Sequence, residues 1–161
     1  FDTTTSGVDF IANYSTSLFN GDSTFALAYN YTKTEVDRFS ENITGSFKVS
    51  RLENDLPNHR GTFTWSQSWD TISMFTRVNY YGTYQGVHVD GIVGDGESAI
   101  TIDTEVSYHV NDGVTVSLGA QNIFDQDATE INDPSFGGIY YETSPFGFNG
   151  GFYYLKATYN F

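Results

Sequence analysis

The residues best placed to do chemistry lie in one segment rich in Gly and Asp, residues 85–98. His88 and Asp90 stand two positions apart there and could serve as the acid and base of a protease. The carboxylates of 90–97 could also hold a divalent cation, because hard cations prefer oxygen ligands. This run lacks the ordered spacing of a calcium-binding loop, so a solvated acidic loop is the alternative. A pair so close together in a loop is a poor catalytic signature, and we predict that the chain is not an enzyme.

The other metal-binding residue types give no support for a metal centre. His59, His88 and His109 are scattered and have none of the short spacings of zinc ligands. The chain of 161 residues has no Cys, which rules out disulfide bridges and thiolate ligands. We therefore predict no bound metal and no cofactor. A net charge of −13, from 20 acidic and 7 basic residues, also argues against a nucleic-acid partner, whose phosphates would be repelled.

Charged residues also recur on the polar side of several segments that alternate between apolar and polar residues. They are Arg77, Asp103, Glu105, His109 and Lys156. Charges on the inner face of a small barrel or sandwich are costly to bury, but they are tolerated where that face lines water or a polar plug. We predict that these side chains form a salt-bridge network on such an inner face. A ligand site made from the same residues is the alternative.

The elements that carry these residues are predicted to be β-strands. Period-two alternation, the pattern of a strand with one apolar and one polar face, marks the stretches 7–19, 24–32, 61–69, 72–84, 100–110, 114–121 and 150–161. In the last stretch, Leu155 and Tyr159 alternate with Lys156 and Thr158. The segment 43–49 could add a short extra strand. No stretch of useful length shows the 3.6-residue period of a helix.

The connections between these stretches alternate in length along the chain. Short turns at 20–22, 69–71 and 111–113 alternate with long segments at 33–59, 85–98 and 122–150. Outer-membrane β-barrels have this arrangement, because their periplasmic turns are short and their extracellular loops are long. The mean hydropathy of −0.35 also fits, since lipid-facing and lumen-facing residues cancel in the average. A secreted β-sandwich would alternate too, but it does not explain the alternation of loop lengths.

Aromatic side chains are concentrated on the apolar side of the predicted strands, many of them near strand ends. The Tyr and Trp residues in these positions are Tyr14, Tyr29, Tyr31, Trp65, Trp69, Tyr80, Tyr84, Tyr108, Tyr153 and Tyr159. Such a distribution is typical of the aromatic girdles that membrane proteins place at the two lipid–water interfaces. The predicted fold is therefore an all-β, antiparallel transmembrane β-barrel segment of about seven strands.

Several motifs resemble the C-terminal part of TonB-dependent receptors. Residues 116–125, Val-Ser-Leu-Gly-Ala-Gln-Asn-Ile-Phe-Asp, are similar to the family's penultimate strand, which ends in an Asn-Leu-Phe-Asp-like sequence. Further similarities are the Tyr-Tyr-Glu of 140–142, the Ser-Pro-Phe-Gly of 144–147, the Tyr-Asn-Phe of 159–161, the Ser-Gly-Val-Asp-Phe of 6–10 and the Leu-Pro-Asn-His-Arg of 56–60. The stretch 148–151, Phe-Asn-Gly-Gly, departs from the family, which often has an Arg there.

The resemblance implies that residues 1–161 are the C-terminal part of a TonB-dependent receptor, the last strands of a 22-stranded barrel closed by a plug domain. The plug domain and the earlier strands are absent from this chain. The implied function is active transport across the outer membrane of a Gram-negative bacterium. The cargo would be a scarce, large nutrient, a ferric siderophore or similar metal chelate, and the TonB complex would supply the energy. The alternatives are a passive porin-type barrel fragment and a secreted, soluble β-sandwich binding module.

The resemblance also implies partners and site residues. The partners are outer-membrane lipid, the plug and earlier strands of the same receptor, the TonB complex reached through the missing plug, the outer-membrane assembly machinery and a small-molecule ligand. The loop aromatics that could contact the ligand are Phe136, Tyr140, Tyr141 and Phe146, with packing inside the loops as the alternative. Tyr159 and Phe161 resemble the C-terminal signal that the assembly machinery reads.

Overall fold

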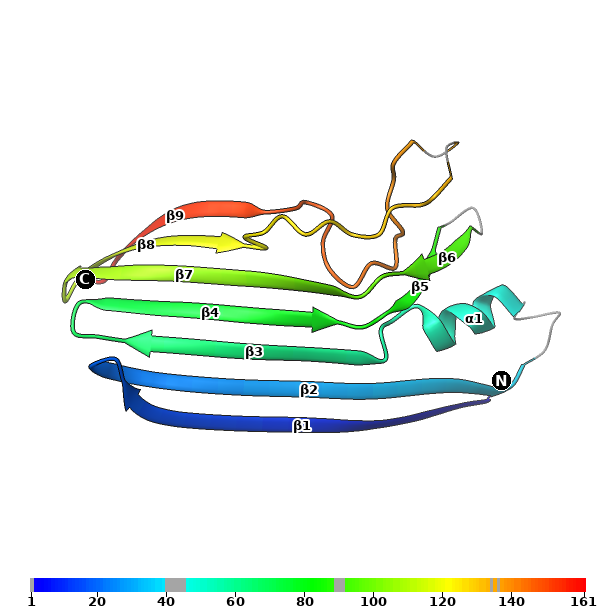
Figure 1. The fold of residues 1–161 in the computed structure, drawn as a ribbon, viewed down its shortest axis with the longest axis horizontal. Helices are drawn as coiled ribbons and strands as arrows, with labels where there is room; N and C mark the ends of the chain where they lie inside the picture. The colour runs from blue at the N-terminus through cyan, green and yellow to red at the C-terminus, as the bar shows by residue number, and fades with distance from the viewer. Residues whose placement is uncertain (1, 40–45, 89–91, 134, 136) are drawn as a thin grey trace.

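The main element of the structure is one antiparallel sheet of seven strands (Figure 1). The computed structural model describes residues 2–39, 46–88, 92–133, 135 and 137–161. In their order across the sheet, the strands are β1 (Asp2–Leu18), β2 (Gly21–Arg38), β3 (His59–Ser68), β4 (Ile72–Tyr81), β7 (Ala99–Asn111), β8 (Val114–Gln121) and β9 (Phe152–Tyr159). The prediction of an all-β chain with an antiparallel sheet of about seven strands is confirmed.

Three further elements lie at one end of the sheet (Figure 1). They are α1 (Ser46–Asn54), between β2 and β3, and the strands β5 (Tyr84–Val87) and β6 (Val93–Gly96), which pair in a separate two-stranded sheet. α1 contacts both β2 and β5. The Val36 N–H donates a hydrogen bond to Glu53 Oε1 at 2.8 Å, and Ser50 Oγ donates to Gln85 Oε1 at 2.5 Å. None of the described helices has the length and apolar character needed to cross a membrane.

The prediction of a short extra strand at 43–49 is wrong for the part that the structure describes. Residues 46–49 lie in α1, and 43–45 fall outside the described residues. The helix is favoured by good helix formers in its second half and by the Arg51–Asp55 ion pair, four residues apart, whose Nε and Oδ2 lie 2.9 Å apart. A nine-residue helix is only marginal by itself, so its contacts with β2 and β5 decide the outcome.

The hairpin of β5 and β6 replaces a segment that the sequence predicts to be a loop. Its glycines make room for two tyrosines, because a Cβ at Gly86 or Gly94 would collide with Tyr141, and one at Gly96 would collide with Tyr84. Tyr84 and Tyr141 are consequently only 7% and 5% exposed. The placement of Tyr84 on the apolar face of the large sheet is therefore wrong, since its ring is buried in the small hairpin.

The first two strands are longer than the apolar alternation predicts. β1 has 17 residues and β2 has 18, so β2 continues through 33–38. Polar side chains pair across this extension: Thr4 Oγ1 donates to Asp37 Oδ2 at 2.6 Å, and the hydroxyls of Thr5 and Thr34 lie 3.0 Å apart. The hydrophobic pattern ends before the strands do, because this part of the sheet is polar on both faces.

The two faces of the sheet have opposite polarity, as the alternation predicts. The register places Val106, Leu118 and Leu155 side by side on neighbouring strands, and these side chains are 45%, 65% and 74% exposed. On the opposite face, the Ser107 and Ser117 hydroxyls lie 2.7 Å apart, and both residues are buried. One face of the sheet thus exposes large apolar side chains, whereas hydroxyl groups pair on the other face.

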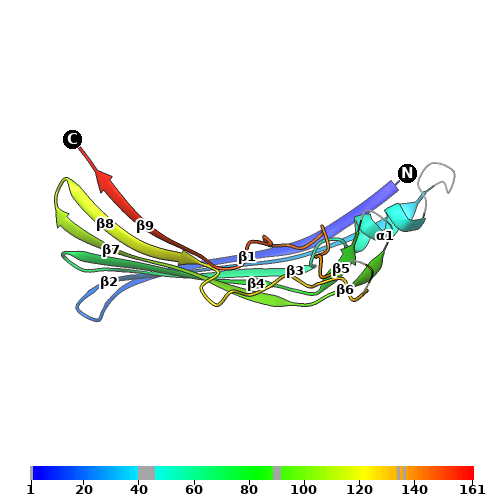
Figure 2. The same ribbon diagram turned by 90° about the horizontal axis from the view of Figure 1, so that it is seen from above.

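The alternation of short and long connections is also an arrangement in space. The sheet is curved along its strands (Figure 2). The short turns and the C-terminus lie at one end of it, whereas α1, the β5–β6 hairpin, the segment 122–151 and the N-terminus lie at the other (Figure 1). All the long segments are therefore gathered at a single end of the sheet.

A polar pair interrupts the apolar face near the turn between β1 and β2. Ser23 Oγ donates a hydrogen bond to Gln67 Oε1, and both residues are 1% exposed although they share the register of the apolar side chains. Gln67 Nε2 donates to the Leu18 carbonyl at 3.1 Å, and Trp69 Nε1 donates to the Phe19 carbonyl at 2.9 Å. The turn thus covers the polar pair, and Trp69 lies outside the strands as part of this cover.

Candidate functional site

The best-connected charged group on the polar face is the carboxylate of Glu105 in β7. Lys156 Nζ and the Tyr154 hydroxyl both donate to Glu105 Oε2 at 2.8 Å, and Ser107 Oγ donates to Oε1 at 3.3 Å. Gly119, which lies between Glu105 and Tyr154 in the register, leaves room for the Tyr154 ring, because a Cβ there would collide with it. The ion pair therefore belongs to a network that spans β7, β8 and β9.

The other predicted members of the network share this face but form separate clusters. Arg77 and Asp103 are register partners on β4 and β7, yet no ion pair joins them within the described part of the chain. The Arg77 guanidinium instead lies 5.0 Å from the centre of the Phe75 ring. Asp103 accepts hydrogen bonds from Asn79 Nδ2 at 3.1 Å and from the Asn122 N–H at 2.9 Å.

His109 forms the third cluster, nearer the short turns. Its Nε2 lies 3.2 Å from Ser73 Oγ and its Nδ1 lies 3.1 Å from Thr115 Oγ1, so both ring nitrogens have hydroxyl partners. The predicted residues are therefore on one face, but only Glu105 and Lys156 form the predicted salt bridge. This arrangement is a lining of small polar clusters along the sheet.

The Asn-Ile-Phe-Asp motif after β8 is a clasp that joins the two ends of the long segment 122–151. Asn122 and Asp125 have positive φ angles of 48° and 57°, and the Asp125 N–H donates to the Asn122 carbonyl at 2.8 Å. The Asp125 carboxylate then accepts a hydrogen bond from the Gly151 N–H, just before β9, at 2.6 Å. Sequence reasoning found this motif as a family signature and missed its physical role.

The aromatic residues proposed as ligand contacts have different surroundings. Tyr141 is buried against the β5–β6 hairpin. Phe146 is half-buried against Tyr81, with ring centres 5.3 Å apart. Tyr140 is half-buried and stacks on Phe148, with ring centres 5.7 Å apart and planes 4° apart. The fourth candidate, Phe136, lies outside the described residues.

Tyr140 lies in a strongly acidic environment. The Asp127 carboxylate raises the pKa of the Tyr140 hydroxyl above its usual value, and burial, Glu130 and Asp125 add to the effect. The segments 84–98 and 122–151 hold three and five acidic residues, and neither holds a Lys or Arg. These two segments therefore add only negative charge to this end of the molecule.

The proposed acid–base pair and cation site fall partly outside the structure. Asp90 is not among the described residues, and the His88 Nε2 lies 3.5 Å from the Glu142 Oε1. Within the described ranges, no three His, Asp or Glu side chains are grouped so that they could hold a metal ion. Asp95 and Glu97 instead lie on the wall of a cavity.

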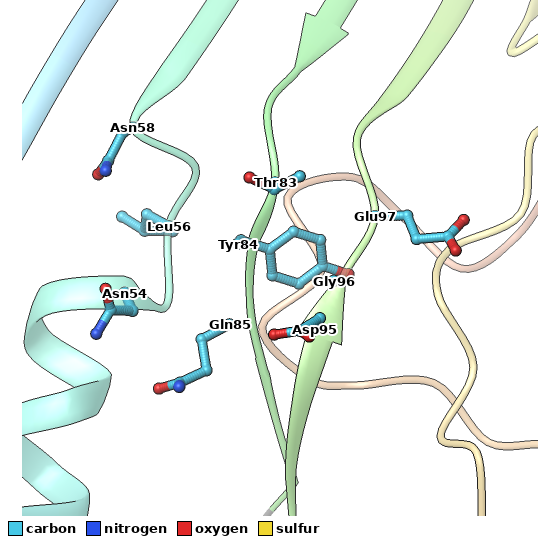
Figure 3. A pocket seen from close by; sticks show the side chains of 9 residues that line it. All are labelled: Asn54, Leu56, Asn58, Thr83, Tyr84, Gln85, Asp95, Gly96 and Glu97. Atoms are coloured by element: carbon cyan, nitrogen blue, oxygen red, sulfur yellow. The ribbon is translucent and has the colours of Figure 1, made fainter.

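This cavity, of about 580 Å³, lies between the C-terminal end of α1 and the β5–β6 hairpin, and we call it the α1–β5 cavity (Figure 3). Its lining residues are Asn54, Leu56, Asn58, Thr83, Tyr84, Gln85, Asp95, Gly96 and Glu97. A second cavity of about 410 Å³ lies on the polar face of the sheet, where Asn79, Asp103 and Gln121 meet Phe146 and Phe152. The volumes of both cavities lie within the range of small-molecule sites.

The C-terminal residues proposed as an assembly signal lie at the end with the short turns (Figure 1). The rings of Tyr159 and Phe161 are 6.1 Å apart, and Phe161 is fully exposed. The Asn160 N–H donates to the Gly113 carbonyl at 2.8 Å, which holds the chain end beside the β7–β8 turn. β1 and β9 are the two edge strands of the sheet.

The comparisons with known proteins show a likeness of fold. No family model matches the chain, and no curated protein matches it. A solved structure of the FpvAI–pyocin S2 complex matches with a TM-score of 0.63 and 14% sequence identity. The match covers 97% of this chain and 19% of the matched chain. The matched structure is a complex of a TonB-dependent receptor. The chain thus has the all-β architecture of one part of a much longer protein and a distant structural relationship to it.

Proposed function

We propose that this chain forms part of the wall and extracellular loops of an active transporter in the outer membrane of a Gram-negative bacterium. Residues 1–161 are, in this proposal, the C-terminal part of a TonB-dependent receptor barrel. The transporter takes up a scarce, large nutrient, a ferric siderophore or a similar metal chelate, with energy from the TonB complex. The chain binds and guides the cargo and catalyses no reaction.

The observation that carries the proposal is the apolar face of the large sheet, which the Ser23–Gln67 pair interrupts near one turn. Val106, Leu118 and Leu155 form one row of it, and all three are exposed. Removing one such side chain from water is worth about 1.5–3 kcal/mol, so a whole face of them in water would be strongly unfavourable. Soluble monomers rarely expose so large an apolar patch. Lipid on this face and water on the other would satisfy both sets of side chains.

The edges of the sheet support a place within a larger barrel. β1 and β9 are edge strands, and unpaired backbone groups are very costly in hydrocarbon. Both edges therefore need partner strands, which the earlier part of the receptor would supply. The likeness to the FpvAI complex, of which the match covers 19%, is consistent with one part of a large receptor barrel.

In the assembled receptor, each group of candidate residues has a proposed role. The network of Glu105 and Lys156 faces the lumen and contacts the plug, through which the TonB complex acts. The gathered long segments face outside and receive the small-molecule ligand. Tyr159 and Phe161 are recognised by the outer-membrane assembly machinery. No role involves nucleic acid, which the net charge of −13 disfavours.

Uptake of a radiolabelled ferric chelate by cells that carry the full-length protein tests the function. Uptake that depends on both the receptor and the TonB complex is the expected result. Uptake that persists without the TonB complex would identify a passive porin. Heat-modifiable gel migration and a need for detergent are expected of the purified protein, and a protein that stays folded and monomeric without detergent would overturn the membrane assignment.

A further inference from the structure

The chain contains the dipeptide Asn-Gly twice, at 20–21 and at 149–150. The first lies at the turn between β1 and β2, and the second lies in the long segment before β9 (Figure 1). In an Asn-Gly pair the backbone nitrogen of the glycine can attack the asparagine side chain, because glycine has no Cβ to hinder the approach or restrict the backbone. The two copies allow this reaction to be compared in two different surroundings.

At 149–150, the groups that the reaction needs are not held by other residues. Asn149 is exposed, and within the described part of the chain neither its side-chain amide nor the Gly150 N–H has a hydrogen-bond partner. Gly150 has a φ angle of 63°, in the region that favours glycine. The neighbouring Gly151 N–H is the group that donates to the Asp125 carboxylate. The clasp therefore fixes the residue after Gly150 and leaves the Gly150 nitrogen unpaired.

At 20–21, the sheet holds the same groups. Asn20 is also exposed, but Gly21 is the first residue of β2 and pairs with Leu18 of β1. A Cβ on Gly21 would collide with the Ser68 carbonyl and with the Trp69 ring, so this glycine is closely packed. The Gly21 backbone can turn toward the Asn20 side chain only after this end of the hairpin opens.

We propose that Asn149 is a site of spontaneous deamidation. Asparagine is one of the chemically labile residue types. The Gly150 backbone nitrogen attacks the Asn149 Cγ, the Cγ–Nδ2 bond breaks, and ammonia leaves with the proton that the backbone nitrogen loses. Water then opens the resulting succinimide at either of its carbonyls, so that hydroxide adds to the carbonyl carbon and hydrogen returns to the nitrogen. The products are aspartate and isoaspartate, and water is the only co-reactant.

The modification changes two features of the surrounding structure. Asn149 lines the cavity of about 410 Å³ on the polar face, where Asp103 is the acidic lining residue, so either product adds a second negative charge to that lining. Isoaspartate also lengthens the main chain by a carbon atom directly before Gly150, next to the Gly151 N–H that the Asp125 carboxylate binds. The aged protein would therefore have a more negative cavity and a displaced start of β9.

The test follows the incorporation of heavy oxygen from isotope-labelled water. The full-length protein is kept in detergent at neutral pH in this water for several weeks, and the label is assigned to single residues by mass spectrometry with peptide fragmentation. We expect the label at position 149 to appear at least about tenfold faster than at position 20, which corresponds to an opening free energy of about 1.4 kcal/mol at the hairpin. Equal rates at the two positions, or no label at 149, would overturn the proposal.

The products and two variants test the route of the reaction. Isoaspartate is expected beside aspartate at position 149, and aspartate alone would exclude the succinimide. Asn149→Gln keeps a side-chain amide but must close a larger ring, so this position should stay unlabelled over the same period. The matched control Asn20→Gln should leave the rate at 149 unchanged. Labelling of Asn149→Gln at the rate of the unsubstituted protein would refute attack by the Gly150 nitrogen.

Discussion

Leu118→Arg is the substitution that separates a lipid-facing sheet from a water-facing one most clearly. Leu118 is 65% exposed and lies between Val106 and Leu155 in the register. Along β9, Leu155 lies between Tyr153 and Tyr159, both on the apolar face, so this row is inside the apolar band. An Arg on the lipid face costs about 2–4 kcal/mol at the bilayer midplane. At a water-exposed position, the same change stays within about 0.5 kcal/mol.

The assay is reversible urea unfolding of the full-length protein in lipid vesicles, and the folded fraction is measured by heat-modifiable gel migration. The matched control is Thr62→Arg, an exposed position on the polar face of β3. We expect Leu118→Arg to lower the free energy of unfolding by at least about 2 kcal/mol and Thr62→Arg to leave it nearly unchanged. Equal, small effects of the two substitutions would refute the assignment of the apolar face to lipid.

Three further predictions concern single groups. Asp125→Ala leaves the Gly151 N–H without its acceptor and should lower the free energy of unfolding by about 1–3 kcal/mol. Amide hydrogen exchange at Gly151 should become faster, and unchanged exchange would show that this hydrogen bond does not hold the two ends of the segment together. Asp127→Asn should lower the raised pKa of the Tyr140 hydroxyl, as measured by absorbance titration. Because folding raises this pKa, the stability that Tyr140 contributes is present below its unfolded pKa and is lost as pH rises through its folded pKa. Phe161→Ala in the full-length protein should reduce membrane levels more than ligand affinity, and normal levels would contradict its role in assembly.

The strands and their two faces were predictable because period-two alternation is a local property of the chain. The apolar positions of β8 and β9, such as Leu118 and Leu155, are on one face in the sequence pattern and in the register alike. The short turns predicted at 20–22 and 111–113 also fall at hairpins, but the turn residues with positive φ in the first hairpin are Phe19 and Asn20, and Gly21 already pairs with Leu18. Local patterns therefore carry most of the architecture of the large sheet.

The missed features depend on contacts between distant parts of the chain. The burial of Tyr141 requires Gly86 and Gly94, about fifty residues earlier, and no local pattern reveals that match. α1 is too short for a clear helical period and is held by Val36 and Gln85. Short polar elements at the end of a sheet are stabilised by tertiary contacts, which a single sequence does not display.

The sequence predicts that the charged residues lie on one face of the sheet, but it does not predict which of them form hydrogen bonds or ion pairs. Alternation places Arg77 and Asp103 on the same side, and the register even makes them partners. Their actual contacts are decided by neighbours: Asn79 and Asn122 donate to the Asp103 carboxylate, and Phe75 lies under the Arg77 guanidinium. The charges of these residues and the face of the sheet on which they lie therefore predict that they are near one another. Which of them form hydrogen bonds or ion pairs depends on the neighbouring side chains.

Site-directed fluorescence quenching at Leu155 and Lys156 tests the central claim most directly. These neighbours on β9 point to opposite faces and are both accessible, with Leu155 74% exposed and the Lys156 side chain 51% exposed. Each is replaced by Cys and labelled with a fluorophore in the full-length protein, free of other reactive cysteines, in lipid vesicles. We predict that a lipid-bound quencher acts on the label at 155 and a water-soluble quencher on the label at 156. Quenching of both labels by the water-soluble reagent alone would contradict the account.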